Sequence, residues 1–304
     1  MHIKIGSRKS KLALWQTNHV ADRLSELGHT FELLLIESEG DKVLDTPLPL
    51  MGGKGVFTKA LDEAICNNVI DIAIHSFKDI PTELDSNLEV CAILKRENPT
   101  DALVCGKDLD FLNNDSAVIA TSSNRRKAQW LHKYPKHRMV DIRGNVPTRI
   151  QKLKDSQWDA TILASAGLIR LGLENEIGQE LTWMVSAQAQ GAVAIICHKE
   201  NEPIKSIINE LNDEDTALCT NIERSFLNIL NGGCSAPVGA YVTLSENTLY
   251  FKGIVVSTDG QEKITISLKD NKTNGLYLAQ RAAQEALDKG AQKLIESAKN
   301  EKYS

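Results

Sequence analysis

The chain has 304 residues, more than a single hydrophobic core usually serves, so we expect two or three domains. A hydrophobic content of 42% and a charged content of 25% exclude the disordered and fibrous classes and indicate a globular protein. The formal net charge of −5 speaks against nucleic acid or a membrane surface as the main partner. No apolar run has transmembrane length and no signal-peptide pattern opens the chain, so we expect a cytoplasmic protein.

The cysteine pattern indicates free thiols. The six cysteines include no CxxC unit, so we expect no metal site. Cys66, Cys91, Cys105 and Cys197 lie in or beside apolar runs, and we interpret them as small core residues. A reducing cytoplasm would leave such thiols free.

Strands and helices alternate from the start of the chain. We expect strands at residues 3–6, 31–37, 69–75 and 89–94, and helices at residues 10–27 and 57–66. The pattern then restarts, with strands at residues 117–120, 139–142, 159–164 and 192–197 and helices at residues 124–133, 146–154 and 166–171. This order predicts two open, doubly wound α/β sheets.

The pattern changes near residue 213. We expect a helix at residues 214–230, strands at 238–244, 249–257 and 263–268, and a final helix at 275–298. Strands followed by a helix predict a small α+β domain. The predicted division is an α/β domain of residues 1–96 with 192–212, a second α/β domain of residues 97–191, and an α+β domain of residues 213–304.

One loop of the last domain presents a single thiol among small residues. Cys234 follows Gly232 and Gly233 and precedes Pro237, so neither a regular helix nor a central strand can pass through it. Such a loop exposes the thiol, and its unpaired backbone amides favour the nucleophilic thiolate. The alternative is a turn with an incidental buried cysteine.

Five cationic loops stand at strand ends or helix starts of this acidic chain. In an open α/β sheet these ends form the ligand crevice, and the planar fork of arginine suits carboxylates. We therefore expect a site for a polyanion. The loops carry Arg8 with Ser10, Lys54, Lys78 with Asp79, Arg125 with Arg126, and Arg143 with Arg149.

Asp79 is the one obvious carboxylate among these cations. Nearby cations favour its charged form, so we expect it to stabilise positive charge in the substrate or to steer a proton. The alternative is a salt bridge to Lys78 or to an arginine. The glycine loop at residues 52–55 lacks the spacing of a nucleotide P-loop, and we reject that interpretation.

Seven motifs, in the same order, make the chain resemble the hydroxymethylbilane synthase family, also called the porphobilinogen deaminase family, over essentially its whole length. They are SKLALWQ at residues 10–16, GGKGVF at 52–57, HSFKDIP at 75–81, TSSNRR at 121–126, RGNV at 143–146, GLIRLG at 167–172 and GGC at 232–234. The chain departs from the usual family pattern at residues 39–41, at Leu50, around Gln190 and at Ile196.

The resemblance implies an enzyme that condenses four porphobilinogen molecules, with loss of ammonia, onto a dipyrromethane cofactor, and then releases the linear tetrapyrrole by hydrolysis. It implies a thioether from Cys234 to the cofactor, Asp79 as the main catalytic residue, two lobes like type II periplasmic-binding proteins with an interdomain cleft, and a monomer. The positions implied to bind cofactor are Ser10, Lys78, Thr121, Ser123, Arg125, Arg126 and Gly144, and those implied to bind substrate are Arg8, Gln16, Lys54, Arg143, Arg149, Arg170 and Gln190.

Two other classes of function compete with this one. A non-enzymatic anion binder would also have two α/β lobes, but it would leave the thiol loop without a purpose. A thiol acyltransferase or cysteine hydrolase would need a histidine beside Cys234 as its base, and only His75 adjoins a motif. A covalent adduct of two pyrrole units on the purified chain would favour the synthase over both.

Overall fold

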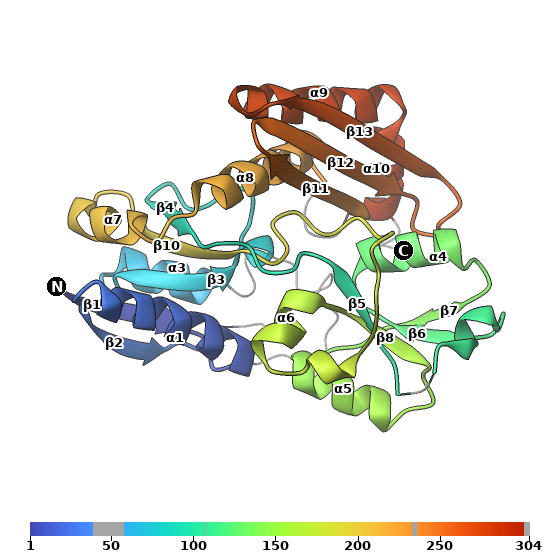
Figure 1. The fold of residues 1–304 in the computed structure, drawn as a ribbon, viewed down its shortest axis with the longest axis horizontal. Helices are drawn as coiled ribbons and strands as arrows, with labels where there is room; N and C mark the ends of the chain where they lie inside the picture. Colours follow the sequence, from blue (N-terminus) through green and yellow to red (C-terminus); the bar gives the residue numbers. More distant parts are fainter. Residues whose placement is uncertain (39–57, 107, 233–235, 301–304) are drawn as a thin grey trace. The chain divides into compact units, whose positions relative to one another are not determined.

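The computed structural model describes residues 1–38, 58–106, 108–232 and 236–300 (Figure 1). The chain forms two compact units, residues 1–97 with 191–217 and residues 98–190 with 218–304. The three-domain division stays a prediction. Among the described helices, none combines the length and apolar character needed to cross a bilayer.

Unit 1 is a mixed five-stranded sheet with the order β2-β1-β3-β10-β4. Its strands are β1 (His2–Ser7), β2 (Thr30–Leu35), β3 (Ile72–Ser76), β4 (Leu88–Ile93) and β10 (Val193–His198). Strand β1 runs parallel to β2 and β3, whereas β10 runs antiparallel to β3 and β4. Strand β10, which comes late in the chain, therefore lies between β3 and β4.

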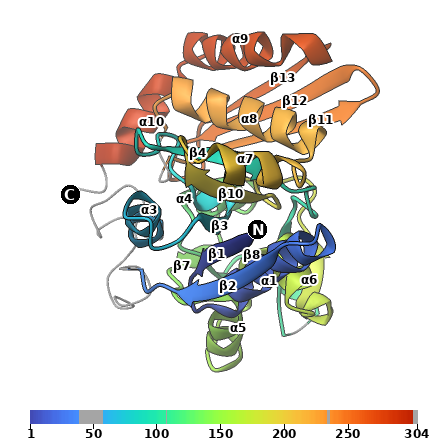
Figure 2. The same cartoon turned by 90° about the vertical axis from the view of Figure 1, so that its left-hand side faces the viewer.

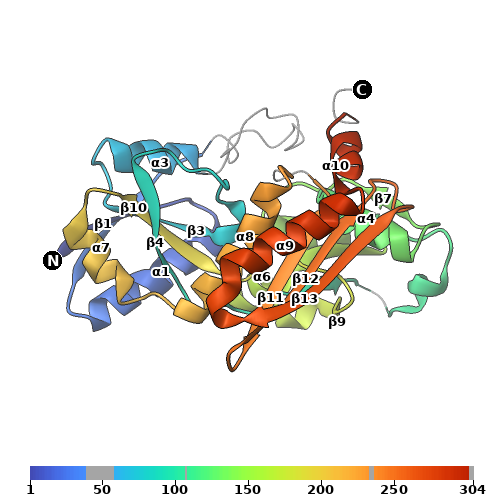
Figure 3. The same cartoon turned by 90° about the horizontal axis from the view of Figure 1, so that it is seen from above.

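Helices cover both faces of this sheet (Figure 3). They are α1 (Lys11–Glu26) and α7 (Glu202–Asn209) on one face and α3 (Lys59–Cys66) on the other, and the short helix η2 (Phe77–Asp79) follows β3. Alternation along β1 explains the arrangement, because Ile3 and Ile5 pack in one core with α1 and α7. Gly6 faces α3 so closely that a Cβ there would lie 2.7 Å from Leu61 Cδ2.

The second α/β sheet, in unit 2, has the order β7-β6-β8-β5-β9. Its strands are β5 (Asp101–Val104), β6 (Val118–Ala120), β7 (Arg138–Val140), β8 (Ala160–Ala164) and β9 (Ile177–Glu180), and its helices are α4 (Asn124–Lys133), α5 (Val146–Lys154), α6 (Ser165–Arg170) and the short η3 (Asp110–Asn113) and η4 (Glu174–Glu176). Leu103 packs with Trp130 of α4, whereas Ala102 and Val104 pack with α5 and α6. The sheet is thus covered on both faces, which confirms the predicted α/β class.

The rest of unit 2 is an antiparallel sheet packed with helices, an α+β arrangement as predicted (Figure 2). The elements are α8 (Glu214–Ile229, which begins in unit 1), β11 (Val238–Ser245), β12 (Thr248–Val256), β13 (Lys263–Asn271), η5 (Lys272–Asn274), α9 (Gly275–Asp288) and α10 (Ala291–Asn300). The prediction of one final helix is wrong. Gly290 has φ +93° and ends that helix, because a left-handed residue cannot continue a right-handed one.

Candidate functional site

The first group of predicted site residues gathers where the parallel neighbours β1 and β3 end. The carboxyl ends of parallel strands meet at one edge of the sheet, so the loops after Ser7 and Ser76 lie together. A cavity opens at this edge. Its polar lining consists of Arg8, Ser10, Gln16, His75, Ser76 and Asp79.

Local hydrogen bonds hold this lining in place. The Ser10 hydroxyl caps α1 by accepting from the Ala13 amide at 3.3 Å. Gln16 is buried, and its Nε2 donates to Ser76 Oγ at 2.9 Å, which ties α1 to the end of β3. Two of the residues predicted to bind cofactor or substrate therefore also fix the shape of the cavity.

His75 is an uncharged group in this cavity. Its side chain is 5% exposed, and Nε2 is buried with no hydrogen-bond partner among the residues that the structure describes. Burial, helped by the charge of Arg8, lowers the His75 pKa to about 3. The imidazole is therefore neutral at physiological pH. The sequence analysis named His75 only as a possible base for Cys234, and the structure instead groups it with Asp79.

Asp79 lies in the one-turn helix η2, directly after β3, with its side chain exposed. Lys78, half-buried in the same turn, lies outside the cavity lining described above. The structure thus brings together Asp79, Arg8, Ser10 and Gln16. A carboxylate beside a guanidinium is an arrangement that can accept a pyrrole N–H and bind a ligand carboxylate within one cavity.

The second group gathers at the corresponding edge of the unit 2 sheet. Strands β6, β7 and β8 are parallel, so the segments after Ala120, Val140 and Ala164 lie at one edge. Ser122 Oγ donates to the Ile142 carbonyl at 2.8 Å and joins two of these segments. The predicted site residues that follow these three strands are Thr121, Ser123, Arg125, Arg126, Arg143, Gly144, Arg149 and Arg170.

Arg125 and Arg126 are held by a carboxylate that the sequence analysis missed. Asp101 is fully buried, and Arg125 Nη1 lies 2.7 Å from its Oδ2 while Arg126 Nη2 lies 2.8 Å from its Oδ1. The two guanidiniums outweigh burial and hold the Asp101 pKa well below its usual range. A signal was present, because Asp101 is a lone carboxylate opening the apolar run Ala-Leu-Val.

Gln190 belongs to the same buried cluster. Its Nε2 donates to Asp101 Oδ1 at 3.0 Å and to the Pro99 carbonyl at 2.8 Å, and the residue is fully buried. In this structure the amide therefore positions Asp101. Substrate binding by Gln190 and cofactor binding by Arg125 and Arg126 stay predictions.

Gly144 fixes the geometry of the loop after β7. Its φ of +116° favours glycine, and an added Cβ would lie 2.7 Å from Thr148 Cγ2. Arg149 Nε donates to the Gly144 carbonyl at 2.8 Å, and Asn145 caps α5 by accepting from the Thr148 amide at 3.0 Å. The loop therefore needs the backbone of Gly144, whose cofactor contact stays a prediction.

Cys234 and Lys54 lie outside the described residues, but the flanks of the thiol loop are described. Gly232 is buried at the end of α8, and Ala236 packs in the same core as β11. Ala240 of β11 donates to the Ser186 carbonyl at 3.1 Å. Glu223 of α8 is fully buried and accepts from the amides of Ala189 at 2.6 Å and Val242 at 2.8 Å. These bonds fasten the base of the loop to the segment that precedes Gln190.

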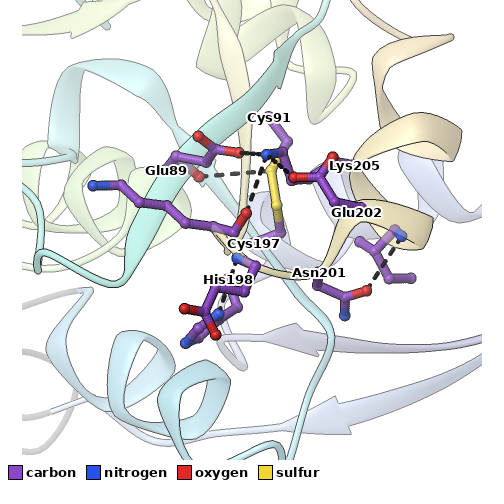
Figure 4. Close-up of a disulfide and its surroundings, with 10 residues drawn as sticks. Glu89, Cys91, Cys197, His198, Asn201, Glu202 and Lys205 are labelled. Carbon is purple, nitrogen blue, oxygen red and sulfur yellow. Dashed lines mark hydrogen bonds and ion pairs between the residues drawn. A yellow bond between two sulfur atoms is a disulfide. The ribbon is translucent and has the colours of Figure 1, made fainter.

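The prediction of free thiols at Cys91 and Cys197 is wrong. The two residues form a disulfide across β4 and β10, with their Cα atoms 6.3 Å apart (Figure 4). They are separated by 106 positions along the chain, so only the strand pairing reveals their proximity. Cys66, Cys105 and Cys219 form no disulfide within the described residues.

Two α/β sheets whose strand ends carry cations and polar groups are typical of a protein that binds an anionic ligand at those ends. The porphobilinogen deaminase, dipyromethane cofactor binding domain family matches residues 3–206, and the porphobilinogen deaminase, C-terminal domain family matches residues 217–288. The chain belongs to the porphobilinogen deaminase family.

Similar proteins agree with this assignment. A porphobilinogen deaminase of a Nitratiruptor species is 40% identical over 305 residues, covering 98% of this chain and 97% of that protein. A probable porphobilinogen deaminase of Methanocaldococcus jannaschii is 46% identical over 260 residues, covering 84% and 89%. Among solved structures, the BvgS periplasmic VFT2 domain of Bordetella pertussis has a TM-score of 0.41 and 13% identity, covering 69% of this chain and 86% of that one. That similarity concerns the fold alone.

Proposed function

We propose that this chain is a hydroxymethylbilane synthase that works through Asp79 and Cys234. It condenses four porphobilinogen molecules head to tail, with loss of ammonia, and releases linear hydroxymethylbilane by hydrolysis. When bound through Cys234, the dipyrromethane cofactor supplies the pyrrole carbon to which the first substrate is added. The observation that carries the proposal is the cavity that groups Asp79 with Arg8 at the edge of the unit 1 sheet.

The chemistry of the cavity fits pyrroles that bear carboxylates. Asp79 offers acceptor oxygens to pyrrole N–H groups, while Arg8 and the capped start of α1 favour carboxylate side chains. His75 adds a neutral imidazole whose Nε2 has no partner in the described part of the chain. Such a lining binds both the positive and the negative parts of one ligand.

Asp79 has the catalytic role in this proposal. Loss of ammonia leaves positive charge on the substrate, and a carboxylate placed beside that charge lowers the barrier to its formation. The positive charge that Asp79 opposes is largest in the transition state, so its charge should contribute more to catalysis than to substrate binding. His75 is neutral at physiological pH, because its pKa is about 3. It therefore adds no positive charge that would weaken the effect of Asp79.

The arginines at the edge of the unit 2 sheet bind side-chain carboxylates in this proposal. Arg143 and Arg149 are half-buried at that edge and present planar forks suited to carboxylates. A charge-assisted hydrogen bond contributes about 1.5–3 kcal/mol, so loss of one arginine should cost roughly tenfold to a hundredfold in affinity or rate. We also propose a cytoplasmic monomer, as the family resemblance implies.

The Asp79→Asn variant tests the catalytic role. It preserves the shape of the side chain and removes its charge, so it should lower kcat far more than it raises KM for porphobilinogen. Asp22→Asn, a change at an exposed position of α1 in the same unit, is the matched control and should leave both parameters unchanged. Near-native kcat in Asp79→Asn would refute the role.

Intact-mass spectrometry tests the covalent assignment. The wild-type chain should carry an adduct of two pyrrole units, and Cys234→Ser should lose both the adduct and almost all activity. Persistence of the same adduct in Cys234→Ser would place the attachment elsewhere. An unmodified, inactive wild-type chain would favour the anion-binding alternative.

A further inference from the structure

The disulfide between Cys91 and Cys197 joins the two strands that carry the chain out of unit 1 and back into it. Unit 1 is left after Glu97, four residues beyond the end of β4, and is re-entered at Gly191, two residues before β10 begins. Within the described residues β4 is an edge strand whose strand partner is β10. The bond therefore links the strand by which the chain leaves unit 1 to the strand by which it returns.

A β-bulge makes this bond possible. Ile195 pairs with Ala92 and Ile196 pairs with Val90, so Cys91 is the extra residue that the ladder leaves without a partner. Successive side chains of a regular strand point to opposite faces, yet Cys91 and Ala92 both pack in the core beneath α7. The bulge turns Cys91 toward that core, where Cys197 also lies.

The two cysteine residues differ in burial. Cys91 is half-buried, whereas Cys197 is fully buried. The surroundings also accommodate a reduced pair, because a Cys91 thiol would have the Glu89 carbonyl, 3.7 Å from its sulfur, as an acceptor. The Lys205 ammonium lies 2.9 Å from a carboxylate oxygen of Glu89 and 2.8 Å from one of Glu202 (Figure 4).

We propose that Cys91 and Cys197 form a reversible dithiol–disulfide site that reacts with small disulfides of the glutathione class, with Cys91 as the entry thiol and Cys197 as the resolving thiol. The Cys91 thiolate attacks one sulfur of the small disulfide, forms a mixed disulfide and releases one small thiolate. The Cys197 thiolate then attacks the Cys91 sulfur and releases the second. Two protein thiols are oxidised by two electrons, the small disulfide is reduced to two thiols, and the two protons leave with them.

The location of the bond gives it a mechanical consequence. Oxidation joins β4 to its partner β10 and closes a loop spanning 106 positions, which contains the whole α/β part of unit 2. Closing so long a loop restricts the unfolded chain and stabilises the fold. In a cytoplasmic protein such bonds respond to oxidants instead of persisting, so stability should follow the redox state.

Differential alkylation tests the site and its asymmetry. The protein is reduced, freed of reductant, incubated with glutathione disulfide, quenched in acid and alkylated with N-ethylmaleimide before peptide mass spectrometry. The wild type should yield cross-linked peptides containing Cys91 and Cys197. Cys197→Ser should stop at one glutathione on Cys91, whereas Cys91→Ser should leave the buried Cys197 unmodified. Cys66→Ser is the control and should form the disulfide like wild type, because Cys66 is a free half-buried thiol of the same unit.

Each outcome is decisive. Alkylation of both Cys91 and Cys197 in the oxidised wild type, or equal glutathione uptake by the two single variants, would overturn the proposal. A measurement on wild type alone covers the case in which a variant fails to fold. The thermal midpoint of the oxidised protein should exceed that of the reduced protein and fall back on addition of dithiothreitol, and equal midpoints would overturn the stabilising role.

Discussion

Replacing Asp101 by Asn should destabilise the fold severely. Asp101 is fully buried and neutralises the guanidiniums of Arg125 and Arg126 at 2.7 and 2.8 Å. Asn preserves the size and one carbonyl acceptor, so the variant mainly removes charge. Removing one partner of a buried ion pair costs about 3–5 kcal/mol, because the remaining charges stay buried without compensation. We expect the free energy of unfolding to fall by about that amount.

Urea denaturation followed by circular dichroism measures this loss, and Asp115→Asn is its control. Asp115 and Lys136 lie 2.6 Å apart, closer than either Asp101 pair, but their side chains are 72% and 68% exposed. Exposed pairs contribute about 0–1 kcal/mol, so the control should be nearly neutral. The reasoning is refuted if the two variants lose similar amounts, since burial would then not decide the cost.

The pH dependence of Asp101 follows from the same contacts. The arginines depress its folded-state pKa below the value in the unfolded chain, near 3.9. The carboxylate therefore contributes its full stability above the unfolded-state pKa, and this contribution is lost as the pH falls toward the folded-state value. Asp101→Asn should accordingly show a weaker acid dependence of its urea midpoint below about pH 4 than wild type.

Three further predictions rest on single contacts. Glu223 accepts from two backbone amides, and in Glu223→Gln the side-chain NH₂ must face one of them. The urea midpoint should therefore fall by the equivalent of about 1–3 kcal/mol. An unchanged midpoint would contradict these bonds. The His75 pKa is about 3 in the folded state and about 6.5 in the unfolded chain. Between these values the unfolded chain binds more protons than the folded protein, so the free energy of unfolding rises with pH, by up to about 1.4 kcal/mol per pH unit. His75→Gln should flatten that dependence of the urea midpoint, and a retained slope would contradict the neutral imidazole. Gly144→Ala places an alanine at a positive φ and brings its Cβ close to Thr148, so it should lower the free energy of unfolding by about 1–3 kcal/mol. It should also raise KM for porphobilinogen. A native KM would show that the loop does not position the substrate.

The sequence predicted those helices best whose caps and core positions agree. The bounds of α4 and α5 match the predicted ranges, because Ser123 and Asn145 cap their first turns. Strands β5 and β9 were not predicted, because neither segment shows a clear alternation of apolar and polar residues. The last helix was predicted as one, because a single glycine in a long apolar period was not sufficient signal for a break.

The candidate site shows the same division between local and long-range information. Arg8, Ser10, Gln16 and Asp79 could be grouped from motifs, since strand ends of an α/β sheet converge at one edge. The pairing of Asp101 with Arg125 could not be predicted, because the sequence does not show which carboxylate is buried beside which arginine. Cys91 and Cys197 are 106 positions apart, and their bond depends on a one-residue bulge in the pairing of β4 with β10. The sequence of one strand alone does not determine its register with another strand.

The break in the final helix gives the C-terminal end of the chain a structural task. After Gly290 the chain turns into α10, and Lys299 near its end donates from Nζ to the Asn231 carbonyl at 2.8 Å. Asn231 lies three residues before Cys234, in a left-handed conformation with φ +49°. The last turn of α10 is thus a brace behind the segment that enters the thiol loop. A truncation that removes Lys299 would therefore take away one contact of the segment that leads into the thiol loop.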